Sequence, residues 1–187
     1  MKRNRKLFQL IYAAVFAALI FVVTAIIPPL PIGTLGYAHL GDGLIFIAAA
    51  LLDAPYAIIA AVLGGSLSDL LSPYGSYAMW LPATIIIKGL TAFAFTSKKH
   101  RMICVRNIVA LFIAAVLCSG GYYLYEAVVI AKNFVSPLIS IPFNLMQSAV
   151  GAVLFIIIAI VFDRTPIVKK FFKFDENRID IDYDSDK

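Results

Sequence analysis

Polar and ionisable side chains recur at a similar depth in several otherwise hydrophobic segments of the sequence. They are Asp42, Asp69, Trp80, Lys88, Glu126, Asn144 and Gln147. When the segments are threaded through a membrane in alternating directions, all of these residues fall in its outer half. Ionisable groups within a bilayer are costly, so they are seldom kept without a pairing or binding role. Their shared depth therefore indicates a solute pocket that opens to the outside.

Two carboxylates of this set belong to neighbouring segments. Asp42 follows His39 in the first turn of the second segment, and Asp69 lies near the outer end of the third. Asp42 can cap the free N–H groups of its helix or bind a ligand, and His39 can order the preceding loop or contact a ligand. A helix C-terminus disfavours an anion, so Asp69 needs a partner and is the stronger functional indication.

Lys88 is the residue of this set that is least favourable to bury in a membrane. We expect it to pair with Asp69 or Glu126 rather than to contact a ligand directly, because an isolated charge inside a bilayer is so unfavourable. Trp80 and Tyr122 are aromatic residues with two open interpretations. They either belong to the belts at the membrane interface or stack on a flat ring.

Two amides complete the polar set. Asn144 and Gln147 are one turn apart on the sixth segment and share a face. Amides that faced lipid would lack hydrogen-bond partners, so both should point into the protein. Together, the carboxylates, amides, amine and aromatic rings suit a compact, polar heteroaromatic molecule that carries hydroxyl or amino groups.

The composition is that of a membrane protein. Hydrophobic residues make up 61% of the 187 residues, and the mean hydropathy is +0.90. We predict an all-α membrane protein, a multi-pass bundle of six transmembrane helices in the cell membrane with cytoplasmic N- and C-termini. Turn-forming and charged residues separate six hydrophobic segments. These segments cover residues 7–27, 40–53, 55–71, 79–97, 105–131 and 138–163.

Basic residues set the expected orientation. They cluster before the first segment, between the fourth and fifth, and after the sixth, and Lys88 and Lys132 are the exceptions. With six spans these clusters share one side, which the positive-inside rule makes cytoplasmic. We therefore divide the chain into a basic cytoplasmic N-terminus (1–6), a six-helix substrate-binding domain (7–165) and a charged cytoplasmic tail (166–187), expected to be disordered. The net charge of +5 then reflects topology rather than nucleic-acid binding.

The second and third segments are short for membrane spans. About fifteen residues of helix cover about 22 Å, against about 30 Å of hydrocarbon. Their outer ends should therefore lie below the membrane surface, where irregular backbone must be covered by protein or line a wet cavity. The apolar loop 28–39 is long enough to act as that cover, and a simple tilted hairpin is the alternative.

Small residues recur at every fourth position in two segments. The third segment has two such faces, which predict close packing inside the bundle. They are formed by Ala57, Ala61 and Gly65 and by Ala60, Gly64 and Ser68. The small faces of the first segment either pack internally or dock another membrane protein. They consist of Ala13, Ala14, Ala17 and Ala18.

The sequence gives less support to an intramembrane enzyme or to a self-sufficient transporter or channel. His39 with Ser66 or Ser68 would suggest an intramembrane enzyme, but no Gly-x-Ser-x-Gly elbow occurs. A self-sufficient small transporter or channel is another alternative, against which the lack of an evident inverted repeat argues weakly. The sequence has no Gly-x4-Gly-Lys-[Ser/Thr] motif, so an ATPase for uphill transport must come from partners. Cys104 and Cys118, about 21 Å apart on one helix, are interpreted as packing residues, and we expect neither a metal site nor a cofactor.

Three motifs resemble the substrate-binding (S) components of energy-coupling factor (ECF) transporters, which take up vitamins in prokaryotes. They are Tyr37-Ala38-His39-Leu40-Gly41-Asp42, Gly64-Gly65-Ser66-Leu67-Ser68-Asp69-Leu70-Leu71 and Pro82-Ala83-Thr84-Ile85-Ile86-Ile87-Lys88-Gly89. The resemblance covers residues 7–165 and is greatest to the branch that includes riboflavin, hydroxymethylpyrimidine and pyridoxine carriers. Asp53-Ala54-Pro55 departs from the pattern, since relatives often carry a Gly-Pro turn there.

The resemblance implies a non-catalytic subunit that captures a vitamin of the pyridoxine or hydroxymethylpyrimidine type and delivers it by toppling in the membrane. Riboflavin is the alternative ligand. The resemblance also implies a pocket under the first loop, docking of the first-segment alanines onto a transmembrane coupling subunit, and two cytoplasmic ATPases that drive this subunit. The predicted substrate-binding residues are His39, Asp42, Asp69, Trp80, Thr84, Lys88, Tyr122, Glu126, Asn144 and Gln147.

Overall fold

The computed structural model describes residues 5–25, 30–31, 37–38, 40–71, 77–95 and 101–165. Within these ranges it forms six α-helices: α1 (Arg5–Ala25), α2 (Gly41–Leu51), α3 (Ala54–Leu70), α4 (Leu81–Ala94), α5 (Val105–Tyr125) and α6 (Ser140–Arg164). Short irregular helices extend three of them. The 3-10 turn η2 (Ala78–Trp80) precedes α4, the π-helix η3 (Glu126–Ile130) follows α5, and the 3-10 turn η4 (Ser136–Ile139) precedes α6. The six predicted segments thus correspond one by one to the helices.

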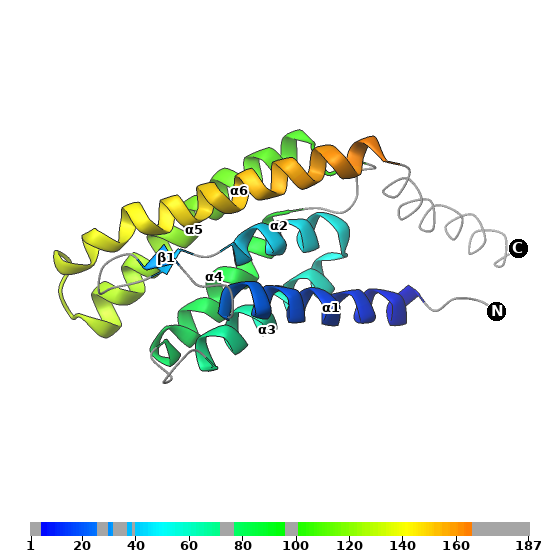
Figure 1. Ribbon diagram of the computed structural model, residues 1–187. Coiled ribbons are helices and arrows are strands. Elements are labelled where there is room, and N and C mark those ends of the chain that lie inside the picture. Colours follow the sequence, from blue (N-terminus) through cyan, green and yellow to red (C-terminus); the bar gives the residue numbers. More distant parts are fainter. Residues whose placement is uncertain are drawn as a thin grey trace, which may run out of the picture.

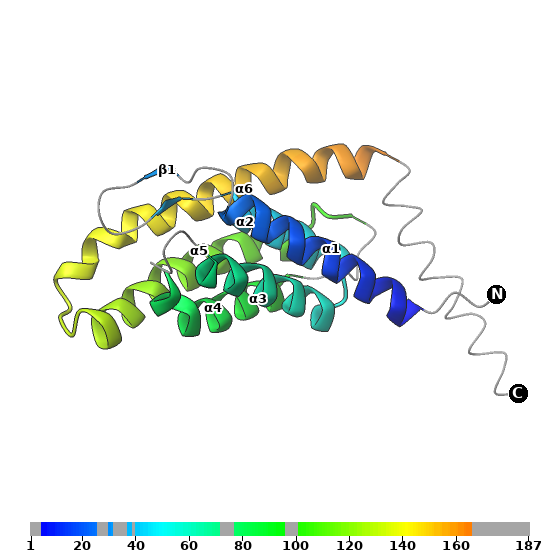
Figure 2. The same cartoon turned by 60° about the horizontal axis from the view of Figure 1, so that its bottom comes forward.

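The helices form a bundle with α2 at its centre (Figure 1). Helix α2 packs against α1, α3, α4 and α6, and all of its residues except Leu44 are buried. This position follows from its sequence, because a helix that is apolar on all sides is stable only inside a protein or a membrane. Around α2, contacts run from α1 to α3, then to α4, α5 and α6. Helices α5 and α6 form a long hairpin along one side of the bundle (Figure 2).

The two ends of the bundle are distinguished here as the terminal end and the site end. Helix α1 begins and α6 ends at the terminal end, on the right of Figure 1, whereas η3 lies at the site end, on the left. At the terminal end, Asp163 accepts hydrogen bonds from the backbone N–H groups of Met102 (2.8 Å) and Ile103 (3.0 Å). The buried Asn107 amide donates to Met102 O at 2.9 Å. These bonds fasten the start of α5 to the end of α6.

Helix length and surface character both fit a membrane. The stretches Lys6–Ala25, Val105–Ile130 and Ser136–Arg164 are long and apolar enough to cross a bilayer, and three shorter apolar helices accompany them. Helix α2, with 11 residues, covers about 16 Å, roughly half of the hydrocarbon thickness. The second segment is therefore even shorter than predicted. Large apolar side chains such as Phe112 and Val116 are exposed, which suits a surface surrounded by lipid.

Glycines allow the helices to cross at short distance. A Cβ atom added to Gly64 would lie 2.7 Å from Ile20 Cβ, so α1 and α3 meet there almost backbone to backbone. A Cβ atom on Gly151 would lie 3.0 Å from both Asp42 Cβ and Gly43 N, which marks the crossing of α2 and α6. The small residues of the third segment are buried, and this confirms their predicted role in internal packing.

A short antiparallel pair of strands modifies the predicted all-α fold. Strand β1 (Leu30–Pro31) pairs with β2 (Tyr37–Ala38) in the loop after α1, and β2 lies against α6. The remainder of the loop predicted to cover the pocket, His39 included, lies outside the described residues. The same holds for residues 1–4 and for the tail 166–187 that was expected to be disordered.

Candidate functional site

Helices α4 and α5 meet through a ladder of two polar rungs. In the outer rung, which lies nearer the site end, Trp80 Nε1 donates a hydrogen bond to Glu126 Oε1 at 3.1 Å. In the second rung, the hydroxyl groups of Thr84 and Tyr122 share a hydrogen bond of 3.0 Å. Each helix advances four residues between the rungs, and side chains four residues apart lie on one helix face. The two pairs therefore stack along the interface of two antiparallel helices.

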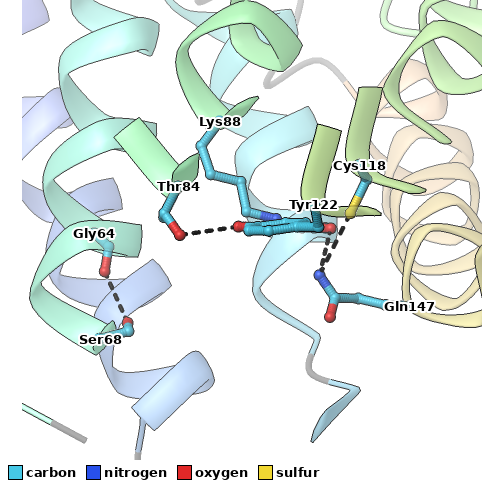
Figure 3. Close-up of polar contacts among 8 residues, drawn as sticks. Gly64, Ser68, Thr84, Lys88, Cys118, Tyr122 and Gln147 are labelled. Atoms are coloured by element: carbon cyan, nitrogen blue, oxygen red, sulfur yellow. Dashed lines mark hydrogen bonds and ion pairs between the residues drawn. The ribbon is translucent and has the colours of Figure 1, made fainter. Parts of the chain in front are cut away.

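Four more side chains form an inner cluster one turn deeper in the bundle. Lys88 Nζ of α4 lies 2.5 Å from Asp42 Oδ1 of α2. Gln147 Nε2 of α6 donates to Asp42 Oδ2 at 2.9 Å, and it lies 4.0 Å from Cys118 Sγ of α5. Lys88 Nζ is also 5.5 Å from the centroid of the Tyr122 ring, within the range of a cation–π contact. Figure 3 shows Lys88, Tyr122, Cys118 and Gln147 converging on one place.

The inner cluster is buried, and its positive and negative charges form an ion pair. Asp42 and Lys88 are each 3% exposed, so water contributes little to their stability. A buried pair of this kind is maintained by good geometry and by further hydrogen bonds, and removal of one partner leaves an uncompensated charge. Gln147 supplies such a bond to the second oxygen of Asp42. The first turn of α2 adds the positive end of the helix dipole beside the same carboxylate.

The predicted partner of Lys88 was wrong. The sequence indicated Asp69 or Glu126, whereas the structure bonds Lys88 to Asp42. Asp42 is not the N-cap residue of α2, since Leu40 holds that position and Asp42 lies in the first turn. The physical reason is the central place of α2, which directs its first turn toward α4 and α6. Hydropathy reports the length of a helix but not which neighbours surround it.

The other predicted residues that the structure describes lie near the ladder and the inner cluster, and Glu126 of the outer rung lies at the start of an irregular helix. Asp69 is buried on α3, and its carboxylate interacts with the side chain of Thr84. Glu126 is half-buried in the first position of the π-helix η3. Asn144 is half-buried on α6, one turn from Gln147. His39 lies outside the described part of the chain. The predicted polar groups of α2, α3, α4, α5 and α6 are thus brought to one region.

Cys118 is a member of the inner cluster that sequence reasoning assigned only to packing. It is 2% exposed and contacts the amide of Gln147. Its spacing from Tyr122 was an available signal, since both lie on one face of α5 four residues apart. A thiol is apolar enough to be mistaken for a core residue, and only the three-dimensional arrangement reveals its polar neighbours.

The four alanines of the first helix fall into two groups. Ala13 and Ala17 are 1% and 8% exposed, and they pack within the bundle. Ala14 and Ala18 are exposed. The face that remains accessible on α1 therefore consists of Ala14 and Ala18, whereas Ala13 and Ala17 serve internal packing.

An apolar helical bundle with large apolar side chains on its exterior is typical of a multi-pass membrane protein. A family model described as "ECF-type riboflavin transporter, S component" matches residues 4–164. The chain belongs to this family, and the resemblance seen in its motifs is confirmed. Membership makes it a vitamin-capture subunit of a transporter, a class of protein distinct from enzymes. A search of curated proteins found no significant match.

Proposed function

We propose that the chain captures a hydroxylated heteroaromatic vitamin at the site end and passes it to a coupling module. The observation that carries this proposal is the convergence of side chains from separate helices on one buried region: Asp42, Thr84, Lys88, Tyr122 and Gln147. Helix packing alone does not require charged groups at a common depth in a membrane. A polar ligand explains why they are there.

Riboflavin is the ligand we favour within this class. The description of the matching family names riboflavin transport, and the polar groups from Trp80 to Lys88 extend over about 12 Å of helix at 1.5 Å per residue. This length suits a fused ring system with a hydroxylated chain. Pyridoxine and hydroxymethylpyrimidine, the first choices from the sequence, offer hydroxymethyl and ring-nitrogen groups to the same carboxylates and amides. They are the competing candidates.

The ligand is tested by native mass spectrometry of the protein purified from cells grown in rich medium. We expect a bound mass equal to that of riboflavin. Isothermal titration with riboflavin, pyridoxine and hydroxymethylpyrimidine then ranks the three vitamins. Tighter binding of pyridoxine or hydroxymethylpyrimidine would correct the choice of vitamin. Binding of none of them would contradict the proposed function as a whole.

The proposed orientation places the terminal end in the cytoplasm and the site end outside, in the cell membrane. Four exposed basic side chains, Lys6, Arg101, Arg106 and Arg164, belong to elements of the terminal end, whereas Lys132 follows η3. Basic residues accumulate on the cytoplasmic side of membrane proteins. In intact cells, an impermeant thiol reagent should label Lys132→Cys and leave Arg101→Cys unlabelled. The reverse pattern would move the site to the cytoplasmic side.

The proposed partners are a transmembrane coupling subunit and two cytoplasmic ATPases, with the chain toppling in the membrane to release its ligand. Ala14 and Ala18 are the exposed small residues of α1, and small residues allow a helix of another subunit to approach closely. Ala14→Trp with Ala18→Trp should abolish uptake by cells but leave ligand binding by the isolated protein intact. Joint loss of binding and uptake would exclude this face as a docking surface. Uptake by liposomes that contain the chain alone would indicate a self-sufficient transporter.

A further inference from the structure

We propose that the ligand inserts between α4 and α5 and takes the place of the two rungs of the ladder. Trp80, Glu126, Thr84 and Tyr122 then bond to the ligand instead of to one another. The inner cluster remains intact beneath the ligand as a floor. This inference rests on the proposed function, since it specifies how the vitamin is held.

Each rung is suited to such an exchange. A rung consists of two polar side chains from different helices that bond to each other, Trp80 to Glu126 and Thr84 to Tyr122. Without ligand the pairs avoid the free-energy cost of unpaired polar groups inside the bundle. With ligand, the same donors and acceptors find new partners, so the exchange of hydrogen bonds is close to neutral. Contact of a flat ligand with the indole and phenol rings then supplies the net gain.

Along α4, burial decreases toward the site end. Lys88 and Thr84 are 3% and 2% exposed, whereas Trp80 is half-buried. A ligand that approaches from the site end therefore meets the outer rung first. The bond of Lys88 to Asp42 lies one turn beyond the second rung and closes the inner end of the ladder.

The helices are irregular where the outer rung lies. Trp80 ends the 3-10 turn η2, and Glu126 begins the π-helix η3. A second bond joins the same two elements, from Tyr125 Oη to Met79 O at 2.8 Å. Single π turns within α-helices occur frequently at functional sites, and their hydrogen-bond pattern is less regular than that of an α-helix. Separation of η2 from η3 thus disrupts little regular helix.

The inner cluster cannot separate as easily as η2 and η3. Its members come from four helices, and the crossing of α2 and α6 beside Asp42 is close at Gly43 and Gly151. Separating a buried ion pair leaves two uncompensated charges, which is far less favourable than exchanging the hydrogen bond of a rung for a hydrogen bond to the ligand. The ligand should therefore separate the paired side chains of the two rungs and leave the inner cluster intact.

A disulfide that holds α4 against α5 tests the insertion. A Cβ atom added at Gly121 would lie 2.8 Å from Ile87 Cγ1, so cysteines at 87 and 121 are close enough to be bridged after a small shift. Gly121 is adjacent in sequence to Tyr122 of the second rung. In Ile87→Cys/Gly121→Cys, oxidation should lower the affinity for the best-binding vitamin by about tenfold or more, because the open form is no longer populated. Reduction should restore binding, and peptide mapping should identify the bridge.

A matched pair of cysteines serves as the control. Val62→Cys/Gly89→Cys also replaces one β-branched residue and one glycine, and it bridges α3 to α4 away from the interface with α5, where an added Cβ on Gly89 lies 3.5 Å from Val62 Cγ2. Oxidation of this variant should leave the affinity unchanged. Equal binding by the oxidised and reduced α4–α5 variant would overturn the insertion while leaving the proposed function standing. Failure of the wild-type protein to bind any of the three vitamins would contradict the proposed function itself.

The only tryptophan of the chain gives a second readout that needs no substitution. Trp80 is that residue, and its indole N–H loses Glu126 when the ligand replaces the outer rung. The emission maximum of the wild-type protein should therefore shift when the vitamin is added. An emission maximum that stays constant while calorimetry shows saturated binding would overturn the insertion, even if the α4–α5 cysteine variant does not fold.

Discussion

The rungs at the site end are pairs of side chains that bond to each other across helices, whereas Asp163 and Asn107 at the terminal end bond to backbone atoms. Trp80 with Glu126 is an example of the first kind. Asp163, which accepts from two backbone N–H groups before α5, is an example of the second. Backbone groups inside a membrane protein must be satisfied permanently. Pairs of side chains can change partners, so the first kind is suited to binding a ligand and the second to fixing a loop.

The two ends should therefore respond differently to substitution. Loss of a side chain at the terminal end should lower the free energy of unfolding and leave affinity unchanged. Loss of a rung residue should lower affinity with little effect on stability. The inner cluster is intermediate, because its paired charges contribute to stability and also form the surface against which the ligand is proposed to lie.

The largest effect is expected for the buried ion pair. Lys88→Met leaves the Asp42 carboxylate uncompensated, and removal of one partner of a buried pair costs about 3–5 kcal/mol of unfolding free energy. Thermal unfolding in detergent measures this loss. The double variant Asp42→Asn/Lys88→Met removes both charges and should regain most of the stability. If the double variant is less stable than Lys88→Met, the pair is not the reason for the loss.

A smaller effect is expected at the helix crossing beside Asp42. A Cβ atom on Gly151 would lie 3.0 Å from Gly43 N, which is a backbone atom that cannot move aside alone. Gly151→Ala should therefore destabilise the protein by about 1–3 kcal/mol through overpacking. It should also weaken binding, since the shift separates Asp42 from Gln147. Gly120→Ala is the matched control, because an added Cβ there meets no heavy atom of the described residues within 4 Å and should raise stability by up to about 1 kcal/mol.

A still smaller change in stability is expected at the terminal end. Asp163→Asn keeps one acceptor oxygen and turns an NH2 group toward the other backbone N–H, so one of the two hydrogen bonds is lost and the unfolding free energy should fall by about 1–2 kcal/mol. The affinity for the vitamin should stay at the wild-type value. A loss of affinity without a loss of stability would show that the two ends are not separate in function.

The sequence was sufficient to predict the helices and the family, but not the contacts of the site. Apolar runs separated by turns such as Asp53-Ala54-Pro55 fix where helices begin and end, and this information is local. The partner of Lys88 depends on which helix occupies the centre of the bundle, and that choice is made by packing among all six helices. The π-helix at Glu126 follows from the same packing and has no local signal in the sequence. For Cys118 the spacing from Tyr122 was a signal, but its contact with Gln147 depends on how α5 packs against α6.

The central claim is that the polar groups of the site end bind the vitamin. Isothermal titration of Glu126→Gln beside Asp163→Asn tests it most directly, because each variant converts one half-buried carboxylate to an amide at opposite ends of the bundle. A hydrogen bond to a charged group contributes about 1.5–3 kcal/mol, so Glu126→Gln should bind the vitamin roughly tenfold to more than a hundredfold more weakly. Asp163→Asn should bind as the wild type does. Unchanged affinity in Glu126→Gln, with folding verified by thermal unfolding, would contradict the account.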